Sequence, residues 1–120
     1  MLTVVVIEED SAMRTLICEW LRGEGYAVRG LSLQSAAPAL GVDLVIVDVP
    51  DFRSRGAQTV HAVRTRYPHS VLIGLSTQLG RSLHGDSHAA RALGLRRLVA
   101  KPCARGELLD AVATAISVAR

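Results

Sequence analysis

Five short apolar runs alternate with segments of helical periodicity along this chain. The runs are continuous rather than alternating, as in Thr3–Ile7 and Leu44–Val47. A strand that is apolar on both faces is typical of a parallel sheet covered by helices on both sides. The three other predicted strands are Tyr26–Arg29, Val71–Leu75 and Leu98–Ala100.

The segments between these runs predict helices. Residues 11–23 carry apolar side chains at helical spacing, with Asp10 or Ser11 as the N-cap and Gly23 or Gly25 as the stop. Pro38 interrupts the second segment, for which we expect only one or two turns. The remaining helical segments are Ala57–Arg66, Ser87–Leu93 and a C-terminal stretch that includes Leu108 and Ile116.

The alternation of strands and helices predicts an α/β fold of the three-layer, doubly wound (βα)5 type. Its five-stranded sheet is expected to be parallel, with right-handed crossovers and helices on both faces. The chain has 120 residues, which is the length of one ordinary domain, so we expect residues 1–120 to form a single domain. Functional sites of such sheets lie at the carboxyl ends of the strands.

Composition excludes several classes of protein. Apolar residues make up 49% of the chain and aromatic residues 3%, which predicts an aliphatic core. No apolar run approaches the ~20 residues of a membrane-spanning helix, and no signal-peptide pattern is present. The two cysteines, Cys18 and Cys103, are too few for a disulfide scaffold or a cysteine-rich metal site. We therefore expect a soluble, cytoplasmic domain without membrane contact.

Charge is unevenly distributed along the chain. Residues 52–106 hold ten basic side chains and one acidic side chain, whereas the rest holds four arginines and ten acids. A basic half can indicate an acidic partner or nucleic acid. An arginine-rich, solvated surface is the plainer interpretation, so we do not expect this domain to bind nucleic acid. Thirteen of the basic residues are arginine, and Lys101 is the single lysine.

Polar side chains follow four of the predicted strands. Glu8 and Glu9 come after the first strand, and the third, fourth and fifth strands are followed by Asp48, Ser76 and Lys101. Because the carboxyl ends of parallel strands share one edge of the sheet, we expect these side chains to lie together.

This set of groups is suited to phosphoryl chemistry. Crowded carboxylates repel one another, and a hard divalent cation such as Mg²⁺ removes the conflict. One carboxylate can then attack a phosphoryl group, while a hydroxyl and an ammonium hold the phosphoryl oxygens. A lone lysine among arginines suits this role, since its compact ammonium acts as a point charge.

The chain resembles the receiver domains of two-component response regulators (the CheY-like superfamily) over its whole length. This resemblance implies the flavodoxin-like strand order 2-1-3-4-5. It rests on four segments that occur in the family's order and at nearly the family's spacing: VVVIEED (residues 4–10), DLVIVD (residues 43–48), VLIGLS (residues 71–76) and LVAKP (residues 98–102).

The resemblance also implies a role for each polar group. Asp48 matches the residue that accepts the phosphoryl group. Ser76 and Lys101 match the residues that contact that group or pair with the acceptor. The implied cofactor is Mg²⁺, held by Glu8, Glu9, Asp48 and the backbone carbonyl of Pro50.

Partners follow from the same resemblance. A histidine kinase or a phosphotransfer protein is expected to supply the phosphoryl group. A downstream protein or output domain is expected to read the surface formed by the helix over 87–93, the strand over 98–100 and the C-terminal helix. The chain is then a signalling domain rather than an enzyme, with self-catalysed phosphotransfer and dephosphorylation at most. Homodimer formation is left open.

Three departures from the family favour an alternative. Glu9 stands where an aspartate is usual, Leu98 replaces a tyrosine or phenylalanine, and the stretch Gln78–His84 holds about three extra residues. The alternative is an atypical pseudo-receiver, a protein-interaction module without regulated phosphorylation. A metal site on His84 and His88, which would share one face if helical, is set aside because no third strong ligand lies nearby.

Overall fold

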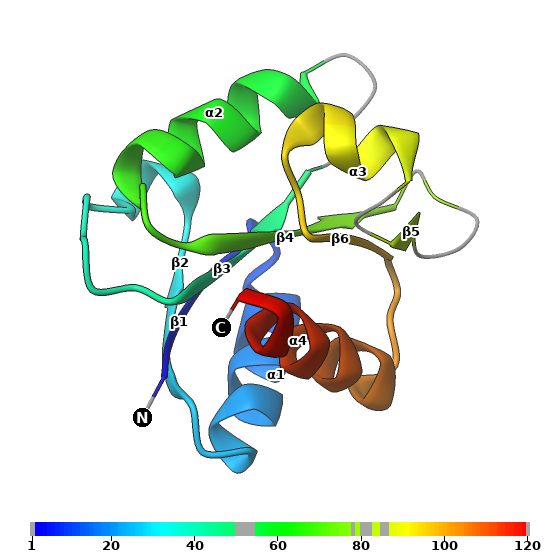
Figure 1. The fold of residues 1–120 in the computed structure, drawn as a ribbon. Helices are drawn as coiled ribbons and strands as arrows, with labels where there is room; N and C mark the ends of the chain where they lie inside the picture. Colours follow the sequence, from blue (N-terminus) through cyan, green and yellow to red (C-terminus); the bar gives the residue numbers. More distant parts are fainter. Residues whose placement is uncertain (1, 50–54, 78, 80–82, 85–86, 120) are drawn as a thin grey trace.

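A computed structural model of the chain describes residues 2–49, 55–77, 79, 83–84 and 87–119. Its elements follow the predicted order along the chain (Figure 1). In that order they are β1 (Thr3–Ile7), α1 (Ser11–Gly23), β2 (Ala27–Leu31), the 3₁₀ turn η1 (Leu33–Ser35), β3 (Leu44–Asp48), α2 (Gly56–Arg66), β4 (Val71–Ser76), β5 (Leu83–His84), α3 (His88–Leu93), β6 (Arg97–Ala100) and α4 (Arg105–Ala119).

The sheet has the order β2-β1-β3-β4-β6-β5. Its first five strands are parallel, so the predicted order 2-1-3-4-5 is confirmed, with β6 as the fifth parallel strand. The sixth strand, β5, was not predicted. It pairs antiparallel with β6, with Leu83 opposite Leu98. Two residues are too few to give a periodic signal, and they lie in the stretch Gln78–His84 for which we expected extra residues.

The helical segment between β2 and β3 is the shortest of the fold, as Pro38 led us to expect. The crossover from β2 to β3 contains the short turn η1 and no α-helix, in line with the one or two turns expected there. Side chains close this turn, because Ser35 Oγ accepts from Ser32 N at 3.1 Å and donates to Ser32 O at 3.1 Å. Such local hydrogen bonds compete with helix formation, and Pro38 removes a backbone donor that a longer helix would need.

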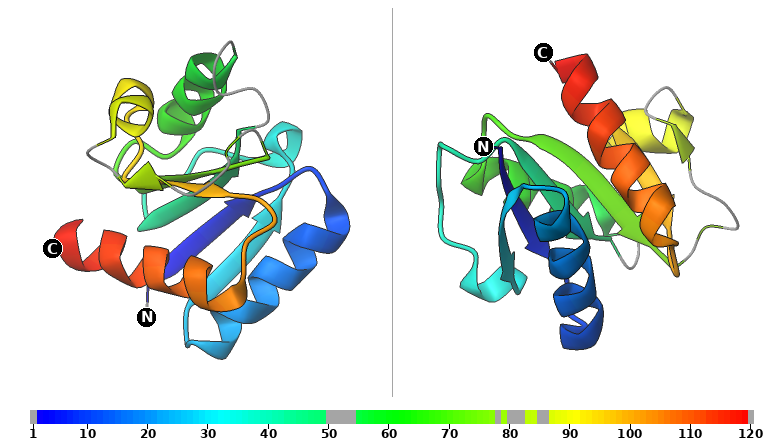
Figure 2. Two further views of the ribbon diagram at one scale, coloured as in Figure 1. Left: turned by 90° about the vertical axis from the view of Figure 1, so that its right-hand side faces the viewer. Right: turned by 90° about the horizontal axis from the view of Figure 1, so that it is seen from below.

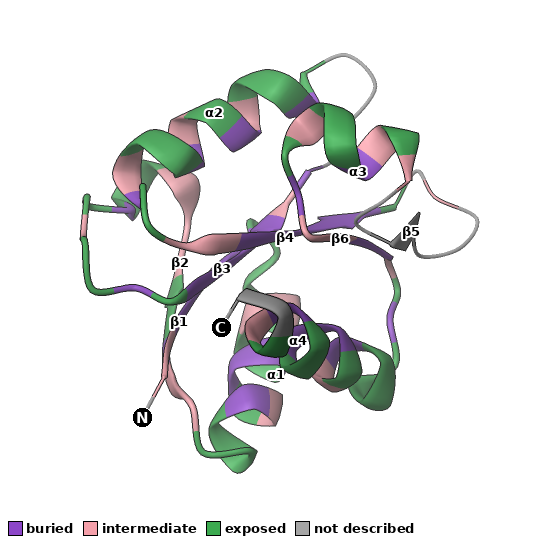
Figure 3. Ribbon diagram, viewed as in Figure 1, coloured by how far each residue is buried: buried purple, intermediate pink, exposed green. Residues whose placement is uncertain are grey.

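The predicted three layers are present. Helices α1 and α4 cover one face of the sheet, and α2 and α3 cover the other (Figure 2). Side chains alternate between the two apolar cores, as Val4 and Val6 join the α1/α4 side and Val5 joins the α2/α3 side. The central strands are buried on both faces (Figure 3), which explains why their sequences read as continuous apolar runs.

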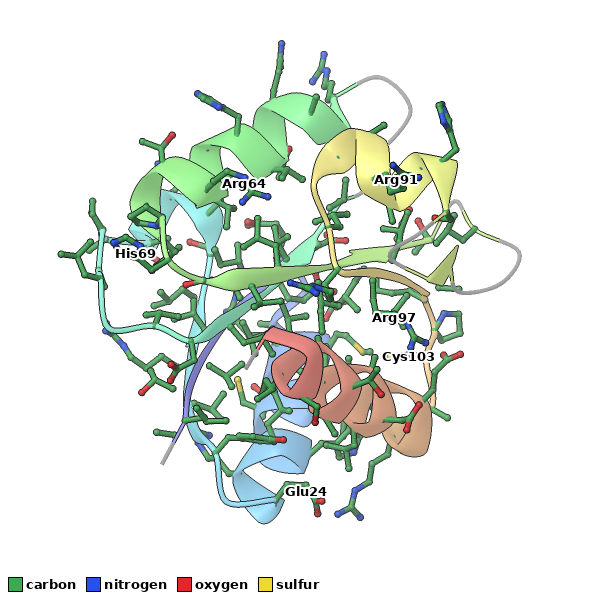
Figure 4. The ribbon with its side chains drawn as sticks, viewed as in Figure 1. Glu24, Arg64, His69, Arg91, Arg97 and Cys103 are labelled. Carbon is green, nitrogen blue, oxygen red and sulfur yellow. The ribbon has the colours of Figure 1, made fainter. Side chains whose placement is uncertain are left out.

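Helix ends follow the sequence signals. Asp10 caps α1, and its Oδ1 accepts from Met13 N at 3.0 Å. Helix α3 ends at Gly94, whose φ of 74° is in the left-handed region that glycine adopts without strain. Arg64 Nη2 donates to Gly94 O at 2.7 Å, and Figure 4 shows this side chain between α2 and α3. One arginine of the basic half therefore has a structural contact.

Glycine is required at position 74 by close packing. A Cβ added to Gly74 would lie 2.7 Å from Leu95 Cδ1 and 2.9 Å from Leu98 Cδ1. We expect Gly74→Ala to lower the free energy of unfolding by about 2 kcal/mol, because the core must be displaced. Urea unfolding tests this, with Gly41→Ala as the control, since nothing lies within 4 Å of a Cβ there. Equal midpoints for the two variants would contradict it.

No helix in the described part of the chain has both the length and the apolar character needed to cross a membrane.

Candidate functional site

Four parallel strands bring the polar groups to one edge of the sheet. Glu8 directly follows β1, Asp48 and Ser76 end β3 and β4, and Lys101 directly follows β6. Strand register aligns them, because Asp48 lies opposite Leu75 and Ser76 lies opposite Ala100. The sheet therefore assembles the site from segments far apart in the sequence.

Lys101 joins two carboxylates at this edge. Its Nζ lies 2.6 Å from Glu8 Oε1 and 3.0 Å from Asp48 Oδ1. The three side chains are 13%, 0% and 12% exposed for Lys101, Glu8 and Asp48, so the cluster is largely desolvated. The contact with Glu8 is also a hydrogen bond. Asp48 Oδ1 is buried without a hydrogen-bond partner of its own, so its contact with the ammonium is ionic.

Burial sets the protonation of this cluster. Desolvation raises the pKa of Glu8 above its ordinary 4.5, and the nearby Asp48 carboxylate raises it further, against the opposing effect of Lys101. Desolvation lowers the pKa of Lys101, but its contacts with Glu8 and Asp48 outweigh that effect and raise it above 10.5. The ammonium is therefore charged at neutral pH and partly compensates two acidic groups.

The Glu8 main chain is also held in place. Its carbonyl accepts from Arg14 Nη1 at 2.6 Å, and its Oε2 accepts from Glu9 N at 3.2 Å. Arg14 lies on α1, six residues along the chain, and its side chain crosses β2 at Gly30. A Cβ at Gly30 would lie 3.0 Å from Arg14 Cγ and 2.9 Å from Cys18 Sγ. Glycine thus leaves room for the arginine that holds the site.

The structure does not bring Glu9 to the other acids. Its side chain is exposed, and Oε1 accepts from Leu33 N at 3.0 Å, at the start of η1. Ser76 is fully buried at the end of β4, and its carbonyl accepts from Lys101 N at 2.8 Å. Pro50, whose carbonyl is a predicted metal ligand, lies outside the described residues.

The donor set can accept a hard cation in part. Glu8 and Asp48 supply carboxylate oxygens, which Mg²⁺ prefers, and Asp48 Oδ1 already lies 3.0 Å from Lys101 Nζ. Within the described ranges, no three His, Cys, Asp or Glu side chains are grouped as a ready-made metal site. Glu9 is not grouped with these two acids, so its side chain would have to move to complete the set. His84 lies in β5 and His88 begins α3, so the two do not share a helix.

Comparison with known proteins identifies the fold. No family model matches the chain. The regulatory protein VirG of Agrobacterium fabrum is 29% identical over 119 residues, which cover 96% of this chain and 46% of VirG. The chain therefore spans about half the length of this relative.

Solved structures of receiver proteins superpose on almost the whole chain. Chemotaxis protein CheY4 of Vibrio cholerae is 23% identical, covers 96% of this chain and 98% of its own, and has a TM-score of 0.73. The receiver domain of sensor histidine kinase PA1611 of Pseudomonas aeruginosa is 22% identical, with 97% and 98% coverage and a TM-score of 0.72. The chain has the receiver-domain fold.

One of these similarities bears on the site, and a further one bears on the fold. The PA1611 receiver domain was solved with a magnesium ion coordinated in its active-site cleft. The same fold also occurs in a putative pilus assembly protein (cpaE) of Burkholderia thailandensis. That protein is 17% identical, with 98% and 99% coverage and a TM-score of 0.74. This fold therefore occurs in a receiver domain solved with magnesium and also in a putative pilus assembly protein.

Leu98 is the residue that the sequence resemblance sets against an aromatic residue of receiver domains. It is fully buried on the α2/α3 side of the sheet, and its neighbour in β4 is Gly74. The side chain is thus part of the core of this receiver fold. Figure 4 shows the region just beyond β6, where buried Cys103 lies between the strand and α4. Cys103 is part of the α1/α4 core.

Sequence reasoning missed two contacts of the site. Arg14 could have been found, since a basic residue in the first turn of a helix that follows an acidic pair is close enough to fold back. The partner of Glu9 could not, because Leu33 contributes a backbone N–H that leaves no signal in the sequence.

Proposed function

We propose that this chain is a receiver domain that accepts a phosphoryl group on Asp48. The main support is the contact of Lys101 Nζ with both Asp48 Oδ1 at 3.0 Å and Glu8 Oε1 at 2.6 Å, at the functional edge of a receiver fold. The Lys101 ammonium places a positive charge beside the Asp48 carboxylate. With 12% of its side chain exposed, Asp48 is still open to a donor.

The proposed step is a direct phosphoryl transfer. A carboxylate oxygen of Asp48 attacks the phosphorus of a phosphohistidine or a small acyl phosphate. A P–O bond to Asp48 forms while the P–N bond to the histidine, or the P–O bond to the acyl group, breaks. The electron pair of that bond leaves with the donor group. The products are an aspartyl phosphate and a released imidazole or carboxylate.

The surrounding residues are assigned by their positions. Lys101 is already 3.0 Å from the acceptor, so its ammonium can follow the charge onto a phosphoryl oxygen. Ser76 ends the neighbouring strand, which suits contact with a second oxygen. Glu8 and Asp48, with Glu9 and the Pro50 carbonyl, are the proposed Mg²⁺ ligands. Bound Mg²⁺ would supply charge neutralisation for the phosphoryl oxygens.

Phosphorylation with a small donor tests this function. Wild-type protein incubated with acetyl phosphate and Mg²⁺ is expected to gain the mass of one phosphoryl group, and Asp48→Asn to gain none. Asp43→Asn is the matched control, because Asp43 lies just before β3 at the opposite edge of the sheet and should leave phosphorylation unchanged. Labelling that is equal in wild type and Asp48→Asn would refute the assignment.

A second function is favoured by one observation. Glu9 is engaged with Leu33 N rather than with the other acids, as expected if the site holds no metal. The chain would then be a pseudo-receiver that binds its partner without phosphorylation. Mass spectra without a phosphoryl gain, together with unchanged amide spectra on Mg²⁺ addition, would favour this alternative.

The partners we propose are those of a receiver domain. A histidine kinase or phosphotransfer protein would donate the phosphoryl group, and a downstream protein or output domain would read the surface of α3, β6 and α4. We assign the domain to the cytoplasm, where such donors act. We assign it to signalling rather than to enzymatic turnover.

A further inference from the structure

Glu9 is hydrogen-bonded to Leu33, which lies outside the cluster of Glu8, Asp48 and Lys101. Glu9 Oε1 accepts from Leu33 N at 3.0 Å, across 24 residues of sequence. The preceding residue is tied to the same region, because Glu8 N donates to Leu31 O at 3.2 Å. The Glu8–Glu9 pair is thus bonded directly to the end of β2 and the start of η1.

The segment that Glu9 holds is weakly structured otherwise. Within the crossover, η1 is a single turn closed by Ser32 and Ser35, and no α-helix follows it. Its far end is anchored at Ala39, whose N donates to Arg66 O of α2 at 3.0 Å. Between these anchors, Leu33 and Ala36 pack against the α2/α3 core. The Glu9 carboxylate is therefore one of several polar anchors of this segment, together with Arg66 O at Ala39 and Ser70 Oγ at Val42.

We propose that the β2–β3 crossover senses cation binding through Glu9. Glu9 accepts from Leu33 N at 3.0 Å, and in the described residues it is not grouped with Glu8 and Asp48, so its side chain must move to join a metal that those two acids hold. When Glu9 joins a bound divalent cation, η1 loses its anchor and the crossover changes conformation. This inference rests on the proposed function, because it requires the site to take up Mg²⁺.

Two features of the chain make this path distinctive. Glu9 is one methylene longer than the aspartate that is usual in the family, and that extra reach extends its carboxylate toward Leu33. Leu98 is packed into the core over Gly74, so its side chain has no room for the movement that we would expect of an aromatic ring at this position. The signal from the site then has a route through β2 and η1. The exposed Leu40, 70% accessible, lies on this same crossover.

Thermodynamic linkage gives the proposal a quantitative form. If Mg²⁺ binding breaks the Glu9–Leu33 bond, a change that destabilises the Mg²⁺-free crossover more than the Mg²⁺-bound one must tighten Mg²⁺ binding by the factor that corresponds to that difference. Ser35→Ala removes the side chain that closes η1 and leaves every residue of the acidic cluster intact. We expect this variant to bind Mg²⁺ about twofold to fivefold more tightly, as the loss of one exposed hydrogen bond allows.

Amide NMR of the whole chain titrated with Mg²⁺ alone tests the proposal. In wild type, Mg²⁺ is expected to shift the amide signals of Glu8 and Asp48 and also that of Leu33, with faster exchange of the Leu33 proton. In Glu9→Asp, the shorter side chain should free the Leu33 amide before any metal is added, so that Mg²⁺ then changes it little. Glu19→Asp, the same change on exposed α1, should behave as wild type.

The outcomes separate the two proposals. Shifts at Glu8 and Asp48 without a change at Leu33, or an unchanged Mg²⁺ affinity in Ser35→Ala, would overturn the crossover coupling and leave phosphorylation of Asp48 standing. Absence of any amide response to Mg²⁺ would overturn both the coupling and the metal-dependent function. A Leu33 response that Glu9→Asp removes, with tighter binding in Ser35→Ala, would support the coupling.

Discussion

Replacing Lys101 with methionine is expected to lower the free energy of unfolding by about 3 kcal/mol at pH 7. The substitution keeps the aliphatic stem but removes the ammonium that lies 2.6 Å from Glu8 and 3.0 Å from Asp48. Two buried or half-buried acids would then share one pocket with no compensating charge. Chemical unfolding followed by circular dichroism measures the loss.

The pH dependence of this loss identifies its cause. Burial raises the pKa of Glu8 in the folded chain above its ordinary 4.5, and removal of the ammonium raises it further. The cost of a charged Glu8 is therefore present at neutral pH and disappears as the pH falls through the folded pKa toward 4.5. The difference in stability between wild type and Lys101→Met should shrink over this range. A difference that stays constant from pH 7 to pH 4.5 would exclude the electrostatic explanation.

Lys101 contributes with the opposite sign at high pH. Its folded pKa is raised above 10.5, so its stabilising effect is complete below 10.5 and is lost as the pH rises through the folded value.

A double variant separates the effect of charge from the effect of packing. Glu8→Gln combined with Lys101→Met should be more stable than Lys101→Met alone by about 1–2 kcal/mol, because no buried carboxylate is left without its partner.

Much of this architecture could be predicted because it is written in local patterns. The runs at Thr3–Ile7 and Leu44–Val47 are buried on both faces, so their apolar continuity reports the covered parallel sheet directly. The same sheet geometry brings Glu8, Asp48 and Lys101 into contact, since parallel strands deliver their ends to one edge. Asp10 as the cap of α1 and Gly23 at its end were likewise predicted from residue type.

The elements that were missed depend on contacts that are not local. Strand β5 has only two residues and is defined by its pairing with β6, which no sequence period reports. The orientation of Glu9 depends on a backbone N–H at Leu33. Residue type alone made Glu9 equivalent to Glu8, although one is exposed and the other fully buried. The sequence therefore predicted that Glu8, Asp48, Ser76 and Lys101 lie at one edge of the sheet, but it did not predict where the Glu9 side chain lies. The functional roles of these residues stay predictions.

Truncation of Leu98 is expected to cost about as much stability as the loss of Lys101. Leu98 is fully buried, and its Cδ1 lies in the space over Gly74 with that of Leu95. Leu98→Ala should lower the free energy of unfolding by about 3 kcal/mol, because it removes buried methyl groups and leaves a cavity. Leu98→Met is the control, and its similar volume should limit the loss to less than about 1.5 kcal/mol.

We expect an aromatic side chain at position 98 to destabilise the protein. In the present packing, a tyrosine ring at position 98 would meet the backbone of Gly74 and the side chain of Leu95, so Leu98→Tyr should lower the free energy of unfolding by about 2 kcal/mol.

A methyl group at position 74 would partly fill the cavity of Leu98→Ala. The double variant with Gly74→Ala should therefore be more stable than the sum of the two single effects predicts, by about 1 kcal/mol. Strict additivity, or a Leu98→Tyr variant as stable as wild type, would show that the space over Gly74 can accommodate the ring and that Leu98 does not fix this part of the core.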